Sequence, residues 1–189
     1  MKLLNLASKL FYYLYLDHVD RSRFNLVFYN NYAGSDLETL LNWEAVILHR
    51  FWKKRLFLKA VEQIKYHKKE GHKIYIITGT LDLIVAPLAS FLEIDGFVAA
   101  EPEVVYGKLT GKLLNKPISG TAKREAIIRI ATTQNIDLSR SYGYGDSQAD
   151  LELLEAVSFP TVVNPSHRFR TIAREKKWET VNWQLKYLT

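Results

Sequence analysis

Two aspartates four positions apart are the residues of this chain whose types and spacing suggest chemistry most directly. Asp146 and Asp150 belong to the run GYGDSQAD at 143–150, which follows a short β-like segment and opens a helix. Carboxylates at the carboxyl end of a strand suit a hard, octahedral cation such as Mg²⁺, which keeps waters that a phosphate can displace. The alternative is structural, because Ser147 and Asp150 have the Ser-x-x-Asp spacing of a helix capping box. This stretch by itself leaves both interpretations open.

A second candidate site directly follows the apolar run at 74–77. That run, IYII, is followed by Thr78, Gly79 and Thr80, a pattern typical of a buried parallel strand whose tip presents a hydroxyl and a backbone N–H. The Thr78 hydroxyl and the Gly79 N–H could hold a phosphate oxygen, because a helix is expected to begin at about residue 81. An ordinary turn between a strand and a helix is the alternative.

A third candidate is Lys123, in the sequence GTAK at 120–123, which opens an amphipathic run. A cation in the first turn of a helix opposes the helix dipole, so this lysine is oddly placed if it serves only helix stability. An anion held nearby would explain its position. The alternative is a lysine that is simply solvated on an exposed helix face.

Alternating strands and helices must position these three sites. Strands are predicted at 73–78, 97–100, 141–144 and 160–163, with a β-hairpin at 104–113. Helices are predicted at 3–16, 21–32, 36–50, 56–70, 81–92, 121–134, 148–156 and 167–176. Strands separated by helices indicate an α/β fold with a parallel sheet covered on both faces.

In chain order, the three motifs resemble motifs two, three and four of the haloacid dehalogenase (HAD) superfamily, and most closely its phosphoserine-phosphatase-like branch. The resemblance extends to whole elements: 70–113 is similar to that branch's second strand, helix, third strand and β-flap, and 159–178 to its last strand and helix. Residues 15–40 resemble its helical cap. The resemblance implies a Rossmann-like α/β core at 57–189, flanked by helices, and an N-terminal helical cap at 1–56.

The resemblance also implies a mechanism in which an aspartate attacks a small phosphate monoester and water hydrolyses the aspartyl-phosphate. Asp146 would ligate Mg²⁺, and Asp150 would ligate it or orient a ligating water. Thr78 and the Gly79 N–H would bind phosphoryl oxygens. Lys123 would neutralise the charge that the nucleophile and the phosphoryl group share.

The sequence departs from the family at its first motif, Asp-x-Asp-x-Thr at the tip of the first core strand, which supplies the nucleophile, the general acid and a metal ligand. No Asp-x-Asp occurs in the chain, and Asp17 and Asp20 come nearest. Because 3–16 is predicted as a helix, no strand precedes them. We therefore expect the first, central strand of the sheet to be missing, with roughly 10–25 residues of strand and loop.

A missing central strand has a structural and a functional consequence. The strands at 73–78 and 141–144 would either pair directly or leave open edges, which favours an unstable, aggregation-prone isolated chain. Three functional classes remain open. They are a phosphatase whose true start lies upstream, a phosphate- and metal-binding remnant without catalysis, and a partner-binding or membrane-surface module that uses the cap.

Composition limits the remaining choices. The chain has 189 residues, 48% of them apolar, no cysteine and a formal net charge of +6, which fits a globular protein without a disulfide framework and, by expectation, a cytoplasmic one. The basic residues are dispersed and no nucleic-acid motif accompanies them, so we expect a small phosphorylated metabolite as partner and no nucleic acid. The apolar run at 3–16 is shorter than the ~20 residues that a membrane span needs. The oligomeric state stays open.

Overall fold

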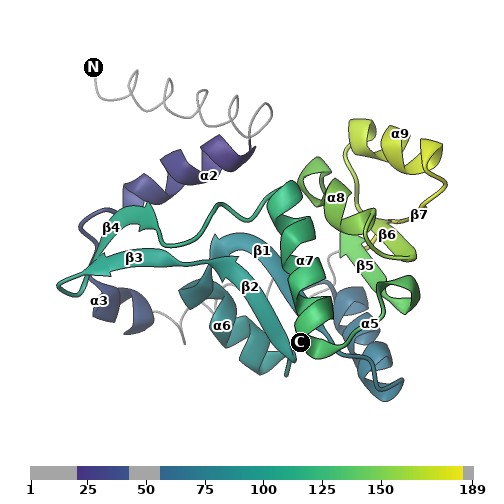
Figure 1. Cartoon of the computed structure of the whole chain (residues 1–189), viewed down its shortest axis with the longest axis horizontal. Coiled ribbons are helices and arrows are strands. Elements are labelled where there is room, and N and C mark those ends of the chain that lie inside the picture. The colour runs from purple at the N-terminus through teal and green to yellow at the C-terminus, as the bar shows by residue number, and fades with distance from the viewer. Residues whose placement is uncertain (1–20, 43–55, 185–189) are drawn as a thin grey trace.

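The computed structural model describes residues 21–42 and 56–184 (Figure 1). Its N-terminal part contains α2 (Arg21–Tyr29), a 3-10 helix (Asn30–Tyr32) and α3 (Leu37–Asn42). The first two confirm the helix predicted at 21–32. The predicted helix at 3–16, the end of the one predicted at 36–50, and Asp17 and Asp20 lie outside the described residues.

The first parallel unit is formed by β1 (Tyr75–Leu81) and β2 (Gly96–Ala100), joined by α6 (Asp82–Phe91). Our predicted strand end at 78 is wrong, because β1 runs through the Thr-Gly-Thr sequence to Leu81. The reason is a long-range contact: Leu81 pairs with Ala100 across a register shift and is buried. The helix then begins at Asp82, one residue later than expected.

The second parallel unit is a three-stranded sheet in the order β5 (Tyr142–Gly145), β6 (Phe159–Val163) and β7 (Glu179–Val181). Its helices are α7 (Thr121–Gln134), the short α8 (Leu151–Leu154) and α9 (His167–Glu175), with 3-10 turns at Leu138–Arg140 and Gln148–Asp150. The helix predicted at 121–134 is confirmed residue for residue. The sequence did not predict β7, because three residues are too short to show a periodic pattern.

Two further elements complete the described chain. The hairpin of β3 (Pro102–Val105) and β4 (Lys108–Leu113) packs against the segment between α2 and α3, where Gly34 N donates to Leu109 O at 2.8 Å. Helix α5 (Leu58–Lys69) ends just before Gly71, which has a φ of +74° and ends the helix as predicted.

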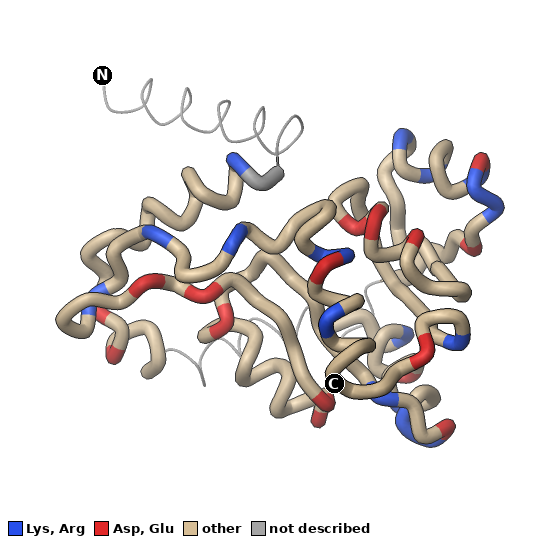
Figure 2. Tube along the Cα trace, in the orientation of Figure 1, with Lys and Arg blue, Asp and Glu red and all other residues tan. Residues whose placement is uncertain are grey.

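The buried core is divided between the two parallel units. One cluster surrounds Phe169, Leu154 and Val162, which are all at most 1% exposed, and belongs to the β5–β6–β7 unit. The other joins Tyr29 of α2 to Leu81 and Ala100 of the β1–β2 unit. Lys and Arg alternate with Asp and Glu along the described part of the chain, in both units (Figure 2).

Strands β1 and β5 do not pair with each other. The direct pairing of 73–78 with 141–144 that we considered is therefore wrong, and no strand of the described residues lies between the two. Helix α7 packs near both units (Figure 1). Residues 74–77, which we predicted as a buried strand, are only partly buried, because none of the described strands pairs with the second edge of β1.

Candidate functional site

A buried ion pair between Lys123 and Asp150 forms the centre of the candidate site. Lys123 lies in the first turn of α7, and its Nζ donates to Oδ1 of Asp150. The two side chains are only 13% and 8% exposed. The interpretation of Lys123 as a lysine solvated on an exposed helix face is therefore wrong, and the carboxylate explains why a cation stands at this helix start.

The second oxygen of Asp150 closes a capping box with Ser147. Oδ2 accepts hydrogen bonds from Asp146 N at 3.1 Å, from Ser147 N at 3.2 Å and from the Ser147 hydroxyl at 3.2 Å. The structural interpretation of the Ser-x-x-Asp spacing is thus confirmed. Gly145 is required beside it, because a Cβ at this position would lie 2.6 Å from the Cβ of Asp150.

These contacts shift the pKa values of Asp146 and Asp150 in opposite directions. Burial by itself would raise the pKa of Asp150, but the charge and hydrogen bond of Lys123, together with the N–H groups of Ser147 and Asp146, hold it below its ordinary value. Desolvation first, and then the charge of Asp150, raise the pKa of Asp146. Asp146 as a residue is exposed, so it is a carboxylate at the rim of the site, beside the charge of Asp150.

Thr78 and Gly79 lie at the carboxyl half of β1. The Thr78 hydroxyl accepts from Thr80 N at 3.1 Å, and the Gly79 carbonyl accepts from the hydroxyl of Tyr29. A Cβ on Gly79 would meet Asn25 Nδ2 at 2.9 Å and the carbonyl oxygen of Ile118 at 3.2 Å. Helix α2 and the loop before α7 therefore both pack directly on this glycine.

The loop before α7 connects the three motifs. It contacts Gly79 through Ile118, and Gly120 N donates to the carbonyl of Ala149 at 3.0 Å, next to Asp150. The structure thus brings Lys123, Asp146 and Asp150 into direct contact and joins Thr78 and Gly79 to them through this loop. Three sequence motifs spread over some seventy residues converge at the carboxyl ends of β1 and β5.

The donors at the site fit a magnesium ion in a limited way. Within 21–42 and 56–184, no group of three or more His, Cys, Asp or Glu side chains is arranged to hold a metal ion. Both oxygens of Asp150 are occupied by protein donors, whereas Asp146 is exposed. Mg²⁺ commonly binds through one or two carboxylates, several waters and a substrate phosphate, so Asp146 suits it as a single protein ligand.

Two groups near the site have no motif that the sequence analysis recognised. Oε2 of Glu152 is buried without a hydrogen-bond partner in the described part of the chain, and the Glu152 carboxylate lies near Gly120. His67 Nε2 lies 2.9 Å from the Tyr144 hydroxyl, and His67 Nδ1 lies 2.9 Å from His72 Nδ1. In the sequence, only their residue types mark Glu152, His67 and His72 as candidates, because the residues that surround them come from distant segments.

The family model of the haloacid dehalogenase-like hydrolases matches residues 2–155. The chain belongs to this family. The predicted superfamily and the similarity to its phosphatases are therefore confirmed, and the α/β fold agrees with solved relatives. No helix in the described ranges is long and apolar enough to cross a membrane.

Two curated relatives come from Mycobacterium tuberculosis. A phosphoserine phosphatase is 31% identical over 124 residues, which are 66% of this chain and 40% of that protein. A probable phosphatase is 30% identical over 167 residues, or 88% of this chain and 57% of that protein. The chain thus spans between two fifths and three fifths of the length of these relatives.

Two solved structures show the same fold. A Bordetella pertussis protein of unknown function has a TM-score of 0.82 at 23% identity. The match covers 95% of this chain and 82% of the Bordetella chain. A probable phosphoserine phosphatase from Vibrio cholerae has a TM-score of 0.73 at 17% identity. The match covers 99% of this chain and 55% of the Vibrio chain.

We expect Asp146→Asn to stabilise the metal-free protein at neutral pH. Because folding raises the pKa of Asp146, its ionised form disfavours the folded state once the pH exceeds the folded pKa, and this penalty vanishes below the ordinary aspartate pKa of about 3.9. Urea unfolding at neutral pH and at about pH 3 measures the difference. The midpoint should rise at neutral pH only, and a lower midpoint there would contradict the raised pKa.

Proposed function

We propose that this chain provides the phosphate- and metal-recognising part of a Mg²⁺-dependent phosphatase that acts on a small phosphate monoester. The observation that carries the proposal is the convergence of Lys123, Asp146 and the Thr78–Gly79 segment of β1 at the carboxyl ends of two parallel strands. Membership of the hydrolase family and the phosphatase names of its relatives support it. The absence of cysteine supports a cytoplasmic setting as part of the same proposal.

Each residue has a role that its contacts allow. The exposed carboxylate of Asp146 would hold the metal ion, which when bound would offset negative charge on the phosphoryl oxygens. Asp150 would act behind it, because its oxygens hold Lys123 and the 146–147 backbone in place. Lys123 would place its remaining donors and its charge beside the phosphoryl group, and Thr78 and Gly79 would bind its oxygens.

The attacking carboxylate has no counterpart among the residues that we can assign. The second candidate function is therefore a protein that binds metal and phosphate but performs no hydrolysis. The lack of any Asp-x-Asp in this sequence favours it for the 189 residues taken alone. The two candidates share the same binding site and differ only in turnover.

We expect these 189 residues to show no hydrolysis of an aryl phosphate above background in the presence of Mg²⁺. Loss of a nucleophile typically lowers the rate by several orders of magnitude. Release of the aryl alcohol measured by absorbance tests this. Robust Mg²⁺-dependent hydrolysis that disappears in Asp146→Asn would contradict the prediction and reveal a substitute nucleophile.

We expect Mg²⁺ together with inorganic phosphate to raise the melting temperature of the chain. At a ligand concentration of 100 times Kd the folded state gains about 2.7 kcal/mol, which is roughly 5–10 °C for a chain of this size. Asp146→Asn and Lys123→Ala should each lose most of that shift, measured against their own ligand-free melting temperatures.

The matched controls are Arg124→Ala and Glu125→Ala, which are exposed neighbours on the same helix. Both controls should keep the full shift, because neither side chain lies at the site. A shift that survives both site substitutions would move the binding site elsewhere and reject the proposed function.

A further inference from the structure

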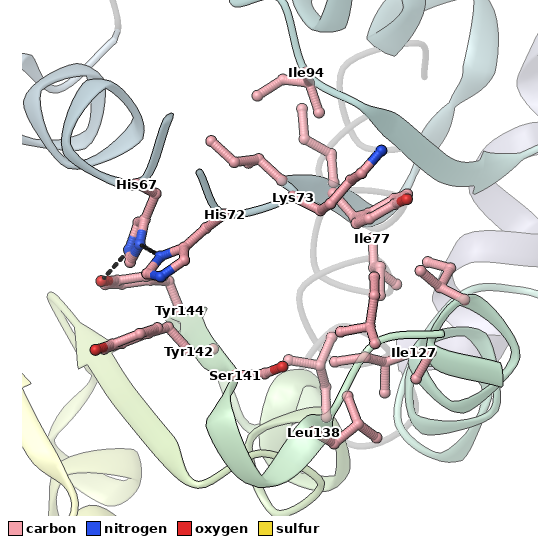
Figure 3. Close-up of a pocket in the computed structure, with 18 of the residues that line it drawn as sticks. His67, His72, Lys73, Ile77, Ile94, Ile127, Leu138, Ser141, Tyr142 and Tyr144 are labelled. Carbon is pink, nitrogen blue, oxygen red and sulfur yellow. Dashed lines mark hydrogen bonds between the residues drawn. The ribbon is translucent and has the colours of Figure 1, made fainter. Parts of the chain in front are cut away.

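Two histidines at the end of α5 link the loop before β1 to strand β5. His67 lies in the last turn of α5 and is 7% exposed, whereas His72 lies in the loop and is exposed. His67 Nδ1 is 2.9 Å from His72 Nδ1, and His67 Nε2 is 2.9 Å from the Tyr144 hydroxyl. Figure 3 shows the two contacts, which run without a break from the loop to β5.

The end of the helix holds the two rings in place. Gly71, with a φ of +74°, turns the chain back, and His72 N donates to the His67 carbonyl at 2.9 Å. The His72 ring also stacks on Tyr142, with the ring centroids 5.6 Å apart and an angle of 28° between the ring planes. The two imidazoles therefore face each other in a fixed arrangement.

The hydrogen-bond partners of His67 assign its proton. The amide nitrogen of Gln63 lies 3.2 Å from His67 Nε2, and an amide nitrogen can only donate. Nε2 of His67 is therefore the accepting nitrogen, and in a neutral ring the proton then lies on Nδ1. That proton points at Nδ1 of His72, which accepts it, so His72 carries its own proton on Nε2.

A positive charge on His72 is incompatible with this order. Both nitrogens of a charged imidazole donate, so the Nδ1–H of His72 would meet the Nδ1–H of His67. The hydrogen bond between the rings survives only if its direction reverses. The bridging proton then passes from His67 Nδ1 to His72 Nδ1, and the one added proton ends on His67 Nε2.

We propose that His67 and His72 form a proton switch, in which a charge gained by the exposed ring reverses the tautomer of the buried ring. Nε2 of His67, which faces Tyr144, thereby changes from an acceptor into a donor. The amide of Gln63 must turn at the same time, because its nitrogen would otherwise meet a second donor.

The surroundings of the two rings place the charge on His72. Burial first, and then the nearby His72, lower the pKa of His67, so a charge on the buried ring is disfavoured. A charged His72 would be in contact with water and would lie against the face of Tyr142, which attracts a cation. The buried ring thus responds to pH without becoming charged itself.

The other titratable groups around the pair do not compete for this proton. Tyr66 of α5 and Tyr142 and Tyr144 of β5 contact the His67 ring, and tyrosines ordinarily keep their protons up to about pH 10. Burial raises the pKa of Tyr144 further. The remaining charged residues near the pair are Lys73, Asp137, Arg140 and Asp150, which line the cavity of Figure 3 together with both histidines, and Glu179, which acts on Tyr144 from β7. In the described part of the chain, none of them forms an ion pair with either imidazole.

A transition metal suits this pair less well than a proton. Two imidazole nitrogens bound to a tetrahedral Zn²⁺ at about 2.0–2.1 Å would lie roughly 3.3 Å apart. The observed separation of 2.9 Å is that of a hydrogen bond. Among the described residues, no third His, Cys, Asp or Glu completes a metal site around the pair.

The switch goes beyond the proposed phosphatase function and does not depend on it. It transmits a change in pH at the surface to Tyr144, which precedes Asp146 by two residues on the strand that leads into the candidate site. The test is nitrogen NMR of the imidazole rings in protein with ¹⁵N-labelled histidine, in the absence of Mg²⁺ and phosphate. Failure here is therefore distinct from failure of the proposed function.

The nitrogen shifts distinguish a protonated ring nitrogen from an unprotonated one, so they report both tautomers and the charged form. Signals are assigned with single histidine-to-glutamine variants. We expect His67 to carry its proton on Nδ1 at about pH 8 and on Nε2 at about pH 5, on either side of the ordinary histidine pKa of about 6.5. The ring of His67 should stay neutral at both values, while both nitrogens of His72 become protonated.

Two variants test the coupling between the rings. His72→Phe keeps a ring against Tyr142 but has no nitrogen, so His67 should keep a single tautomer at both pH values. The matched control is His167→Gln, at the exposed start of α9, which should leave the reversal unchanged.

Four results would overturn the proposal. They are a charged His67 at about pH 5, one and the same His67 tautomer at both pH values in the unsubstituted chain, a reversal that persists in His72→Phe, and a shift of both rings on addition of one equivalent of Zn²⁺, which would reveal a metal site instead. If His72→Phe does not fold, the titration of the unsubstituted chain decides by itself.

Discussion

Replacing Lys123 by methionine is expected to destabilise the fold by about 3–5 kcal/mol, because it leaves the Asp150 carboxylate buried without a counter-charge. The ammonium and carboxylate are both largely shielded from water, so solvent cannot replace the lost partner. The loss is large beside the roughly 5–15 kcal/mol that a typical domain has in total. Urea unfolding monitored by circular dichroism measures it.

Two further variants separate the ion pair from helix effects. Arg124→Met, an exposed neighbour, should change the unfolding free energy by less than about 0.5 kcal/mol. Adding Asp150→Asn to Lys123→Met should recover much of the loss, since asparagine keeps an acceptor for the capping box and carries no charge. A loss below about 1 kcal/mol for Lys123→Met would contradict the burial of this pair.

The ion pair also makes the free energy of unfolding depend on pH. The pKa of Asp150 is lowered on folding, so its stabilisation is complete above the ordinary aspartate pKa and is lost as the pH falls through the folded value. The difference between the unsubstituted chain and Lys123→Met should therefore shrink in acid. A difference that stays constant into acid would point to lost packing of the lysine stem instead.

Phe169→Ala is expected to cost about 3–5 kcal/mol, because Phe169 is 1% exposed at the centre of the cluster that holds the β5–β6–β7 unit. The remaining cluster members, Leu154 and Val162 among them, are fixed by their own strands and helices and cannot close the cavity completely. Thermal unfolding and urea titration should both show the loss.

The matched control for Phe169→Ala is Phe97→Ala on β2, whose side chain is 39% exposed. That change should cost much less, because little buried surface is lost. Since the two core clusters belong to different units, hydrogen exchange in Phe169→Ala should accelerate first at β5, β6 and β7. Equal acceleration in β1 and β2 would show that the two units unfold as one.

Local patterns alone predicted several parts of this protein. The helix at 121–134 was placed correctly at both ends, and α5 was ended correctly at Gly71, because periodicity and end signals act over a few residues. The Ser147–Asp150 capping box was also visible as spacing. The order of the three motifs was enough to indicate the family, which the family match confirms.

Contacts between distant segments decided the remainder. Lys123 and Asp150 are 27 positions apart, and only the fold shows that they pair and are buried. Strand β1 continues to Leu81 because Ala100 receives it, and β7 forms because β6 offers an edge. The contact between His67 and Tyr144 likewise joins residues 77 positions apart. Sequence periodicity reports which face of an element is apolar, whereas the partner of each strand edge is set by long-range packing, and that information is present only in the tertiary structure.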